Sequence, residues 1–521
     1  MSENKRMSKK IKYEISHQTE QLHWESIEIP SMTSGLLIQA DMPEICRCMA
    51  FILVKDPDGT IRLQKLLGHG EQKLGIGLTT KETSIGGVPG NIQAGAWQIG
   101  IGIFTEYVAQ VLGENVENLC LTITEVCEKD LETTAGKEII QEKISDPILG
   151  NCWVKEGLHI SAELYDWQKV YNEETRWYKG DFHTHTHLSD GKETITNAMK
   201  KAEDMNMDFY VPTEHNLIHT GWCNTSLCIL PGVEITTDFG HMNLFGITEF
   251  PERILDIVAE NGNKGRVSGY VNEIISEAKE KGWLTSINHP FLTIWSWRYE
   301  ETLLEGVDCL EIINDPTYPD AAQANDKAVC FLDELWNDGY RIYGVGGSDS
   351  HNLIEERYEG ATLPSIAGDP GTYVFCKELT PKNLIKNVKK GHICVTRFIQ
   401  VEPYIMADGK QYLPGDNLGE AKEIVYNAVI REAKEKPKIY LINNGMKAEL
   451  SVKKNTDGSY EIQEHIVLNH REWQWIRLEI RNQSGELLGY VNPVYKGHKE
   501  PTYKTFGEIA DKLNESNKKL G

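Results

Sequence analysis

The sequence lacks any run of about 18 consecutive apolar residues, the length that a membrane-spanning helix requires. Its first ten residues are charged and no apolar stretch follows them, so no signal peptide is visible. These two absences exclude a membrane-spanning protein and argue against a secreted one. We therefore expect a cytoplasmic protein without a membrane partner.

Paired cysteine motifs are also absent. Among the 11 cysteines, Cys46 and Cys48 lie closest together, but no second pair has zinc-knuckle spacing. The odd number and scattered positions argue against a disulfide framework, so we expect reduced and mostly buried thiols.

Positive charge is scarce. Lys and Arg number 54 against 77 Asp and Glu, which gives a formal net charge of −23. Such a surface repels polyanions, so stable nucleic-acid binding is not expected. A small phosphorylated molecule is compatible with this charge only if a local cation attracts it. The sequence does not indicate an oligomeric state.

A chain of 521 residues is long enough for two to four domains. Residues 1–178 carry short apolar runs separated by turn signals such as Asp56-Pro-Asp-Gly59, which predicts a β-sandwich accessory domain. We interpret it as a packing or docking module, with carbohydrate or partner binding as the alternative. Residues 401–521 predict a small C-terminal β domain with a charged tail. In it, Trp473, Arg477 and Glu479 alternate with apolar residues, which predicts a half-buried strand.

Three histidines stand at alternate positions in residues 180–191. Side chains at i, i+2 and i+4 of a strand point to the same face, so His183, His185 and His187 would share one. The strand would end near Asp190 in a Ser-Asp-Gly turn. Imidazole is the commonest metal-binding side chain, so this stretch is a candidate metal-binding strand.

Residues 179–400 alternate short strands with amphipathic helices, which is typical of an α/β domain. Nearly every predicted strand carries a His, Asp or Glu at or near one end. Active sites of parallel barrels gather residues from the ends of several strands, and buried charges are rare unless they are paired or bind metal. We therefore place nine side chains in one cluster: His183, His185, Asp190, His215, Glu234, His241, His289, Asp349 and His351.

These positions stand in motifs that resemble those of the PHP (polymerase and histidinol phosphatase) family, in the family's order. The motifs are His183-Thr-His185, Ser189-Asp-Gly191, Thr213-Glu-His215, Gly232-Val-Glu234, Asn288-His-Pro290 and Ser348-Asp-Ser-His351. The resemblance implies a distorted (β/α)7 barrel with flanking β-sandwich domains and a hydrolytic site of two or three metals. Gly240-His241 and the flanking domains look most like the carbaryl hydrolase-like subgroup. Glu214, where many members carry Asp, and the additional His187 depart from the pattern.

The resemblance also implies how the ligands divide among the ions. One metal would be held by His183, His185, Glu234 and Asp349, a second by Glu234, His241 and His289, and a third by Asp190, His215 and His351. Glu234 is expected to bridge two ions and, with His215, His351 and Asp349, to be catalytic. Six imidazoles and three carboxylates without a thiolate favour Zn, Mn or Fe over Ca or Mg.

The charge of the loaded site bears on the substrate. Three divalent ions less three carboxylates leave a local charge of about +3, which suits a phosphate dianion. The first hypothesis is therefore a metal-dependent phosphoesterase that hydrolyses a small phosphorylated metabolite or nucleotide with a metal-activated water. With two ions the charge is about +1, and hydrolysis of a carboxylic or carbamic ester is equally plausible. The third hypothesis is a non-catalytic ligand-binding protein on a decayed barrel.

Substrate contacts are predicted less directly by the sequence. His187 could line the pocket, while Trp295 and Trp297 could cover an aromatic leaving group beside Arg298, which would contact phosphate. Core packing is the alternative for the two tryptophans. Arg397 is the third candidate substrate-binding residue, and a surface salt bridge is the alternative for it.

Overall fold

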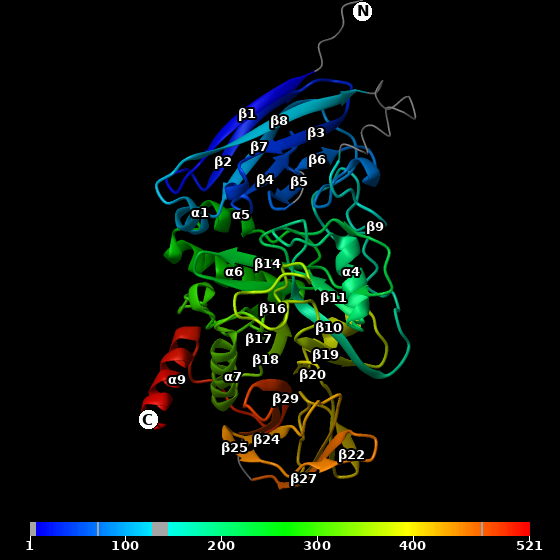
Figure 1. Cartoon of the computed structure of the whole chain (residues 1–521), viewed down its shortest axis with the longest axis vertical. Helices are drawn as coiled ribbons and strands as arrows, with labels where there is room; N and C mark the ends of the chain where they lie inside the picture. The colour runs from blue at the N-terminus through cyan, green and yellow to red at the C-terminus, as the bar shows by residue number, and fades with distance from the viewer. Residues whose placement is uncertain (1–6, 70–71, 128–143, 470–472, 521) are drawn as a thin grey trace, which may run out of the picture.

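The computed structural model describes residues 7–69, 72–127, 144–469 and 473–520. Figure 1 shows three tiers along the long axis of the molecule. The N-terminal strands form the upper tier, the helices and strands that carry the predicted ligands form the middle tier, and the C-terminal strands form the lower tier. The candidate site lies in the middle tier.

The N-terminal strands form two four-stranded antiparallel sheets with a common apolar core. Their orders are β1-β8-β3-β6 and β2-β7-β4-β5. The bounds are β1 Ser8–Ile15, β2 Leu22–Ile29, β3 Thr33–Asp41, β4 Ala50–Lys55, β5 Ile61–Leu66, β6 Lys73–Ile76, β7 Gly95–Ile103 and β8 Glu117–Cys127. In β7, Gly100 and Gly102 leave room for the rings of Trp24 and Phe51, which a Cβ at either glycine would meet. Helix α1, Thr105–Leu112, follows β7 and lies where the upper tier meets the middle tier (Figure 1).

The middle tier contains a five-stranded sheet of order β14-β15-β16-β17-β18. Its strands are β14 Gly232–Thr237, β15 Gly240–Phe245, β16 Leu284–Ile287, β17 Cys309–Asn314 and β18 Tyr343–Gly347. Beside it, β10 (Arg176–Thr184) pairs in parallel with β11 (Phe209–Pro212) and antiparallel with β19 (Gly371–Cys376). Short strands β9 (Asn151–Cys152), β12 (Gly221–Trp222) and β13 (Cys228–Ile229) complete this tier.

Five helices lie between these strands in the sequence: α4 Ile195–Asp204, α5 Ile254–Ala259, α6 Lys264–Lys281, α7 Ala321–Asp338 and α8 Pro381–Val388. Helix α6 ends at Gly282 and α7 at Gly339, both in the left-handed conformation that glycine adopts without strain. Among the described residues, no helix is long and apolar enough to cross a membrane.

Two isolated parallel bridges join the two groups of strands in the middle tier. One links His215 to Glu234 and the other links Thr184 to Ser350. Among the described residues, neither sheet closes on itself as a hydrogen-bonded barrel. The (β/α)7 barrel therefore stays a prediction, while the bridges bring segments that carry candidate ligands side by side.

The C-terminal strands continue a sheet of the middle tier. Strand β20 (Ile393–Thr396) pairs with β29 (Leu487–Gly497), so one nine-stranded sheet runs β13-β11-β10-β19-β20-β29-β28-β24-β25. A second sheet runs β22-β21-β23-β27-β26 and packs against it. The remaining bounds are β21 Gln400–Ala407, β22 Lys410–Tyr412, β23 Glu423–Arg431, β24 Lys438–Asn443, β25 Met446–Glu449, β26 Lys453–Lys454, β27 Tyr460–Val467 and β28 Trp473–Arg481. The domain limits predicted at 178/179 and 400/401 stay predictions, because the sheet is continuous across residue 400.

Strand β28 is not half-buried as its alternation predicted. All but its last residue are buried. The side chain of Arg477 donates to Asp333 of α7 at 2.7 Å and to Glu479 at 3.2 Å, so ion pairs with α7 and within the strand replace solvent on its polar face. The charged tail forms α9, Phe506–Leu520, and Phe506 packs 4.5 Å from Phe331 of α7 between ring centroids.

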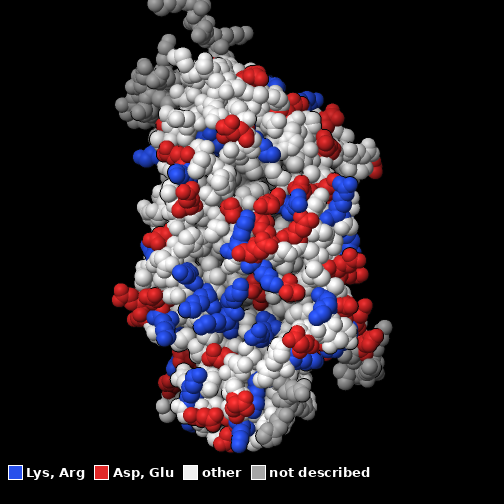
Figure 2. All heavy atoms as spheres, turned by 180° about the vertical axis from the view of Figure 1, so that it is seen from behind, with Lys and Arg blue, Asp and Glu red and all other residues white. Residues whose placement is uncertain are grey.

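The net charge is unevenly distributed. On the face opposite to that of Figure 1, Lys and Arg side chains gather in one area below the middle, while acidic side chains dominate other areas (Figure 2). A net charge of −23 therefore does not describe every face. The expectation of no stable nucleic-acid binding stays a prediction.

Candidate metal centre

The nine predicted ligand side chains converge at one end of the strands of the middle tier. Strands β10, β14 and β15 contain His183, Glu234 and His241, respectively. The other six follow the ends of β10, β11, β16 and β18: His185, Asp190, His215, His289, Asp349 and His351. Side chains separated by as many as 168 positions, from residue 183 to residue 351, thus share one cluster. Five of the nine are buried, namely His183, His185, Glu234, His241 and His289.

Donor atoms in the cluster form three overlapping groups, each within 4.8 Å and each able to hold a metal ion. Two groups share the carboxylate of Glu234: one adds His183 and His185, and the other adds His241 and His289. The third group consists of His185, Asp190, His215 and His351. The groups differ from the predicted division in two respects, because His185 contributes to two of them and Asp349 to none.

Glu234 lies between histidines on both sides. Its Oε1 atom is 3.1 Å from Nε2 of His183, 3.2 Å from Nδ1 of His241 and 3.6 Å from Nε2 of His289. Its Oε2 atom is 2.7 Å from Nδ1 of His215 and 3.8 Å from Nε2 of His185. The two oxygens of one carboxylate therefore face different sets of nitrogens, which is the geometry that a bridging ligand needs.

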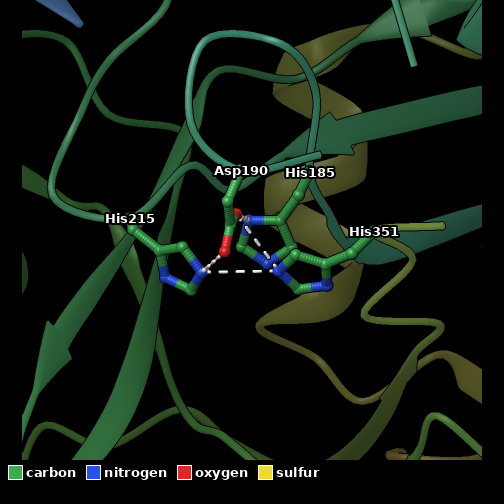
Figure 3. Close-up of side chains that lie close together, drawn as sticks. All are labelled: His185, Asp190, His215 and His351. Carbon is green, nitrogen blue, oxygen red and sulfur yellow. Dashed lines mark hydrogen bonds and ion pairs between the residues drawn. The ribbon is translucent and has the colours of Figure 1, made fainter. Parts of the chain in front are cut away.

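Figure 3 shows the third group, with the rings of His185 and His351 stacked at 4.0 Å between centroids. The Oδ2 atom of Asp190 lies 3.3 Å from Nε2 of His215, and its Oδ1 atom lies 3.3 Å from Nε2 of His351. The two Nε2 atoms are themselves 3.4 Å apart. Two imidazole nitrogens that both present lone pairs repel each other, so this arrangement requires a proton or a cation between them.

Asp349 connects two of these groups. Its Oδ1 atom lies 3.1 Å from Nε2 of His185, 3.3 Å from Nε2 of His183 and 3.5 Å from Nδ1 of His351. Asp349 thus lies beside His183 and His185, and its predicted role as a metal ligand stays a prediction.

Several donor atoms in the cluster are buried without a hydrogen-bond partner. They are His183 Nε2, His185 Nε2, His289 Nδ1 and Asp190 Oδ1. A buried polar atom without a partner costs free energy, and most such atoms in folded proteins are satisfied. Divalent cations at this position would satisfy these atoms, so the residues present fit the metal centre that the sequence predicts.

The histidines of the cluster determine the pKa values of two of its carboxylates. Burial acts to raise the pKa of Glu234, but the imidazoles of His183, His241 and His215 outweigh it and hold the pKa well below its usual range. Asp190 behaves in the same way beside His215 and His351, with a pKa well below its usual range. Both carboxylates therefore stay ionised, and a cation binds more favourably than it would to neutral acids.

The imidazoles divide into two classes. Burial acts to lower the pKa of His183, but the carboxylates of Asp349, Glu311 and Glu234 outweigh it and raise the pKa well above its usual range. Burial, with the neighbouring rings of His351 and His215, lowers the pKa of His185 to about 4. His185 thus has the neutral, lone-pair form that a metal ligand requires.

Four backbone positions near the cluster adopt positive φ without being glycine. They are Asn216 (φ 55°), His289 (26°), Asp315 (26°) and Asp349 (50°). Such conformations cost of the order of 1–3 kcal/mol each and cluster at functional sites when the surrounding structure enforces them. The fold therefore aims His289 and Asp349 into the cluster at a cost in backbone strain.

Glu311 was not among the predicted site residues, although it contacts the cluster. Its Oε1 atom lies 3.0 Å from Nδ1 of His183, and its Oε2 atom accepts the backbone N–H of His289 at 2.9 Å. A carboxylate on the second nitrogen of a ligand histidine fixes the orientation of the ring and raises its basicity. The signal was present in the sequence, because Glu311 interrupts the apolar run of β17.

Glu214, which differs from the Asp of the motif that the sequence resembles, has a structural role next to the cluster. Its buried carboxylate accepts hydrogen bonds from the backbone N–H of Thr186 at 3.1 Å, from the hydroxyl of Ser189, and from His219 at 2.7 Å. The pKa of Glu214 falls to about 2 because these bonds and the charge of His219 outweigh burial. Glu214 thus holds the loop that carries Asp190 and is outside the three metal-binding groups.

The three predicted substrate-binding residues have other partners. His187 contacts the carbonyl of Lys192 at 2.7 Å and Asp146 at 3.4 Å. Arg397 forms a two-bond ion pair with the buried Asp369 at 2.8 and 2.9 Å. Arg298 bonds to the backbone of Asp238 and lies 3.7 Å from Glu106. The cavity at the cluster is lined by other residues, so the geometry does not favour a substrate contact for any of the three.

The two predicted lid tryptophans differ. Trp295 lines the cavity next to the metal-binding cluster, whereas Trp297 is buried and donates to Thr302 at 3.0 Å. Core packing, the alternative interpretation, therefore holds for Trp297.

Comparisons with known proteins add little to this geometry. No family model and no curated protein matches the sequence. A proposed metal-dependent phosphoesterase from Bifidobacterium adolescentis is similar over 35% of this chain and 91% of its own, at 15% identity and a TM-score of 0.23. PliG from Aeromonas hydrophila, a periplasmic inhibitor of g-type lysozyme, is similar over 23% of this chain and 88% of its own, at 9% identity and a TM-score of 0.16. Similarity this low does not assign a function, which must be inferred from the residues of the site.

Proposed function

We propose that this protein is a metal-dependent phosphoesterase with a PHP-type barrel. One observation carries the proposal: the buried carboxylate of Glu234 belongs to two groups of side chains that can each hold a divalent ion, one with His183 and His185 and the other with His241 and His289. Adjacent divalent ions, roughly 3.5–4 Å apart, are typical of hydrolases that act on phosphate esters. The motifs that resemble the PHP family support the same class.

The ligand set also bears on the cofactor. The three groups contain six imidazoles and two carboxylates, and Asp349 next to His183 and His185 is a third carboxylate. This set suits Zn, Mn or Fe, and three such ions would leave a local charge of about +3. When bound, these ions acidify a water molecule and stabilise the negative charge that develops on the phosphoryl group. The expected substrate is a small phosphorylated metabolite or nucleotide.

Hydrogen bonds from neighbouring residues hold the ligand side chains in place. Glu311 fixes the ring of His183, and Thr236 contacts Nδ1 of His215 at 2.6 Å, so each ring keeps its position. Asn288 donates to Oε1 of Glu234 at 2.9 Å and holds the shared carboxylate in place. The burial of Glu234 and His185 keeps bulk water away from the centre of the cluster.

Hydrolysis of p-nitrophenyl phosphate after reconstitution with Mn or Zn tests this proposal. We expect metal-dependent release of p-nitrophenol that is lost in Glu234→Gln, because the substitution removes the shared charge without changing the shape. His498→Ala, at an exposed histidine far along the chain, is the matched control and should retain activity. Hydrolysis that is independent of metal, or equal in both variants, would contradict the proposal.

A second candidate is hydrolysis of a carboxylic or carbamic ester at the same site. It is favoured by Glu106 and Asp315 on the cavity wall, whose negative charge repels a highly charged substrate. Burial raises the pKa of Asp315 to about 6 and that of the third acidic residue, Asp238, to about 7, so Asp238 contributes less charge at pH 7. A p-nitrophenyl ester assayed beside the phosphate separates the two, since turnover of the ester alone would reject the phosphoesterase. The third candidate, a non-catalytic binding protein, requires that the reconstituted protein turn over neither substrate.

A further inference from the structure

The cavity next to the metal-binding cluster is built from two parts of the chain. It has a volume of about 450 Å³. His215, His241 and Asp349 of the cluster form its inner end, and residues of the middle tier form one wall. The opposite wall comes from the N-terminal strands and helix α1, through Cys48, His69, Phe104, Glu106, Tyr107 and Gln110. The sequence analysis interprets the N-terminal domain as a packing or docking module. In the structure, residues of this domain also line the cavity.

Phe104 and Tyr107 place aromatic rings at this wall. The ring of Phe104 meets the ring of His215 edge-on at 6.4 Å between centroids. Its backbone N–H donates to Met49 at 3.0 Å, and its ring packs 5.8 Å from that of Phe51. Tyr107, one turn further along α1, is 43% exposed. Burial raises the pKa of Tyr107, so its hydroxyl stays uncharged.

This wall is fixed with respect to the metal-binding loops. The N–H of Leu66 in β5 donates to the carbonyl of Leu188 at 3.1 Å. The side chain of Gln64 bonds both backbone groups of Ile218, at 2.7 and 3.2 Å. Leu188 is two residues before Asp190 and Ile218 is three residues after His215. The N-terminal strands are therefore held in register with two ligand-bearing loops.

The opposite wall is also aromatic. Trp295 packs edge-on against Tyr318 at 5.4 Å between centroids, and Tyr318 packs edge-on against Tyr358 at 5.2 Å. All three line the cavity, and Trp295 is 37% exposed. Exposed aromatic surface gathered at one concave place is typical of a binding site, because a ligand ring can bury it.

The charged side chains of the cavity disfavour an anionic substituent on a bound ring. Glu106, Asp238 and Asp315 line the cavity. Burial and the charge of Glu106 raise the pKa of Asp238 to about 7, so Glu106 and Asp315 carry most of the negative charge. The cavity lysine, Lys192, is held by Glu356 at 2.8 Å and Asn352 at 3.1 Å. A second anionic group would therefore meet repulsion here, whereas an uncharged ring would not.

We propose that the N-terminal β-structure is part of the substrate pocket, and that Tyr107 and Phe104 face Trp295 across it to bind an uncharged aromatic ring on the leaving group. This inference rests on the proposed function for the position of the phosphoryl group at the cluster. Tyr107 is then a specificity-determining residue that lies more than 70 positions before the first predicted ligand.

Binding of two inert phosphonates to the metal-loaded protein, measured by calorimetry, tests the inference without turnover. We expect phenylphosphonate to bind about tenfold more tightly than methylphosphonate, which corresponds to about 1.4 kcal/mol. Tyr107→Ala should reduce this ratio by about threefold or more and leave the affinity for methylphosphonate unchanged. Trp295→Ala should act in the same direction from the other wall. Val111→Ala, at a 40% exposed position of the same helix outside the cavity, is the matched control.

The rates of hydrolysis of adenosine 5′-monophosphate and ribose 5-phosphate distinguish a nucleobase from a smaller aryl ring. A preference for the nucleotide that Tyr107→Ala removes assigns a nucleobase, and a preference confined to the phenyl pair assigns a smaller aryl group. Equal binding of both phosphonates, or equal loss of both in Tyr107→Ala, overturns the inference. The proposed function fails separately if the protein hydrolyses no phosphate ester in the presence of metal. Phosphonate binding does not depend on turnover, so it still tests the inference in that case.

Discussion

Oε1 of Glu311 lies 3.0 Å from Nδ1 of His183, and both side chains are almost fully buried. The Nε2 atom of the same ring points at Glu234 and Asp349, at 3.1 and 3.3 Å. One imidazole thus connects a carboxylate outside the cluster to the carboxylates inside it.

Glu311→Gln should therefore weaken metal binding or activity by about 10–100-fold, the range typical for the loss of a carboxylate behind a ligand histidine. The ring of His183 would lose the partner that orients it. Metal affinity and kcat/KM of the reconstituted protein measure the effect. Glu305→Gln, at a strongly exposed glutamate, is the matched control, and an equal effect in the two variants would count against the role of Glu311.

Gly68 allows the N-terminal strands to approach the loop that carries Asp190. A Cβ at position 68 would lie 2.6 Å from the carbonyl oxygen of Ser189 and 3.4 Å from Cα of Asp190. Gly68→Ala should cost about 1–3 kcal/mol of stability, as overpacking does, and weaken metal binding by displacing Asp190. Urea unfolding and metal titration measure the two effects.

Gly269 provides the control for this substitution. It lies within α6, and a Cβ at this position would meet no atom within 4 Å. Gly269→Ala should therefore leave metal binding unchanged and stabilise the protein by about 0.5–1 kcal/mol. Unaltered metal binding in Gly68→Ala as well would mean that the N-terminal strands do not position the loop.

His351 predicts how the stability of the metal-free protein depends on pH. Burial acts to lower its pKa, but the carboxylates of Asp190 and Asp349 outweigh burial and raise the pKa to about 9. A pKa raised above the ordinary value of 6.5 contributes stability that is present below pH 6.5 and is lost as the pH rises through about 9. His351→Gln should thus cost on the order of 3 kcal/mol near pH 6 and little near pH 10.

Unfolding of the metal-free protein by urea at both pH values measures this difference. The same cost at pH 6 and pH 10 would contradict it. Reconstitution with metal should keep the cost of His351→Gln at the higher pH, because the cation takes the place of the proton.

The gathering of these nine side chains could be predicted from the sequence because six of them follow short strands and the other three lie within short strands. His215, His289 and Asp349 stand at strand ends, and strand ends at the same side of a sheet meet in space. The role of Glu311 could not be predicted as readily, since its partner His183 is 128 positions away and one acidic residue in a strand has many explanations. The sequence also did not indicate that Arg397 pairs with the buried Asp369.

The cavity wall at Phe104 and Tyr107 could not be predicted from local pattern. Helix α1 is eight residues long and carries no ligand-type cluster, and its position depends on how the upper tier packs on the middle tier. The burial of β28 has a similar cause, because Arg477 finds its partner Asp333 on α7, 144 positions earlier in the chain. Alternation within a strand indicates which residues share a face, but the neighbour that covers the face comes from elsewhere in the chain.

Anomalous scattering from crystals of the manganese-reconstituted protein tests the central claim most directly. The account predicts two anomalous peaks at the Glu234 carboxylate, at ligand distances of about 2.0–2.2 Å, with His183 beside one and His241 beside the other. Folded protein that binds no metal at Glu234 after reconstitution would contradict it.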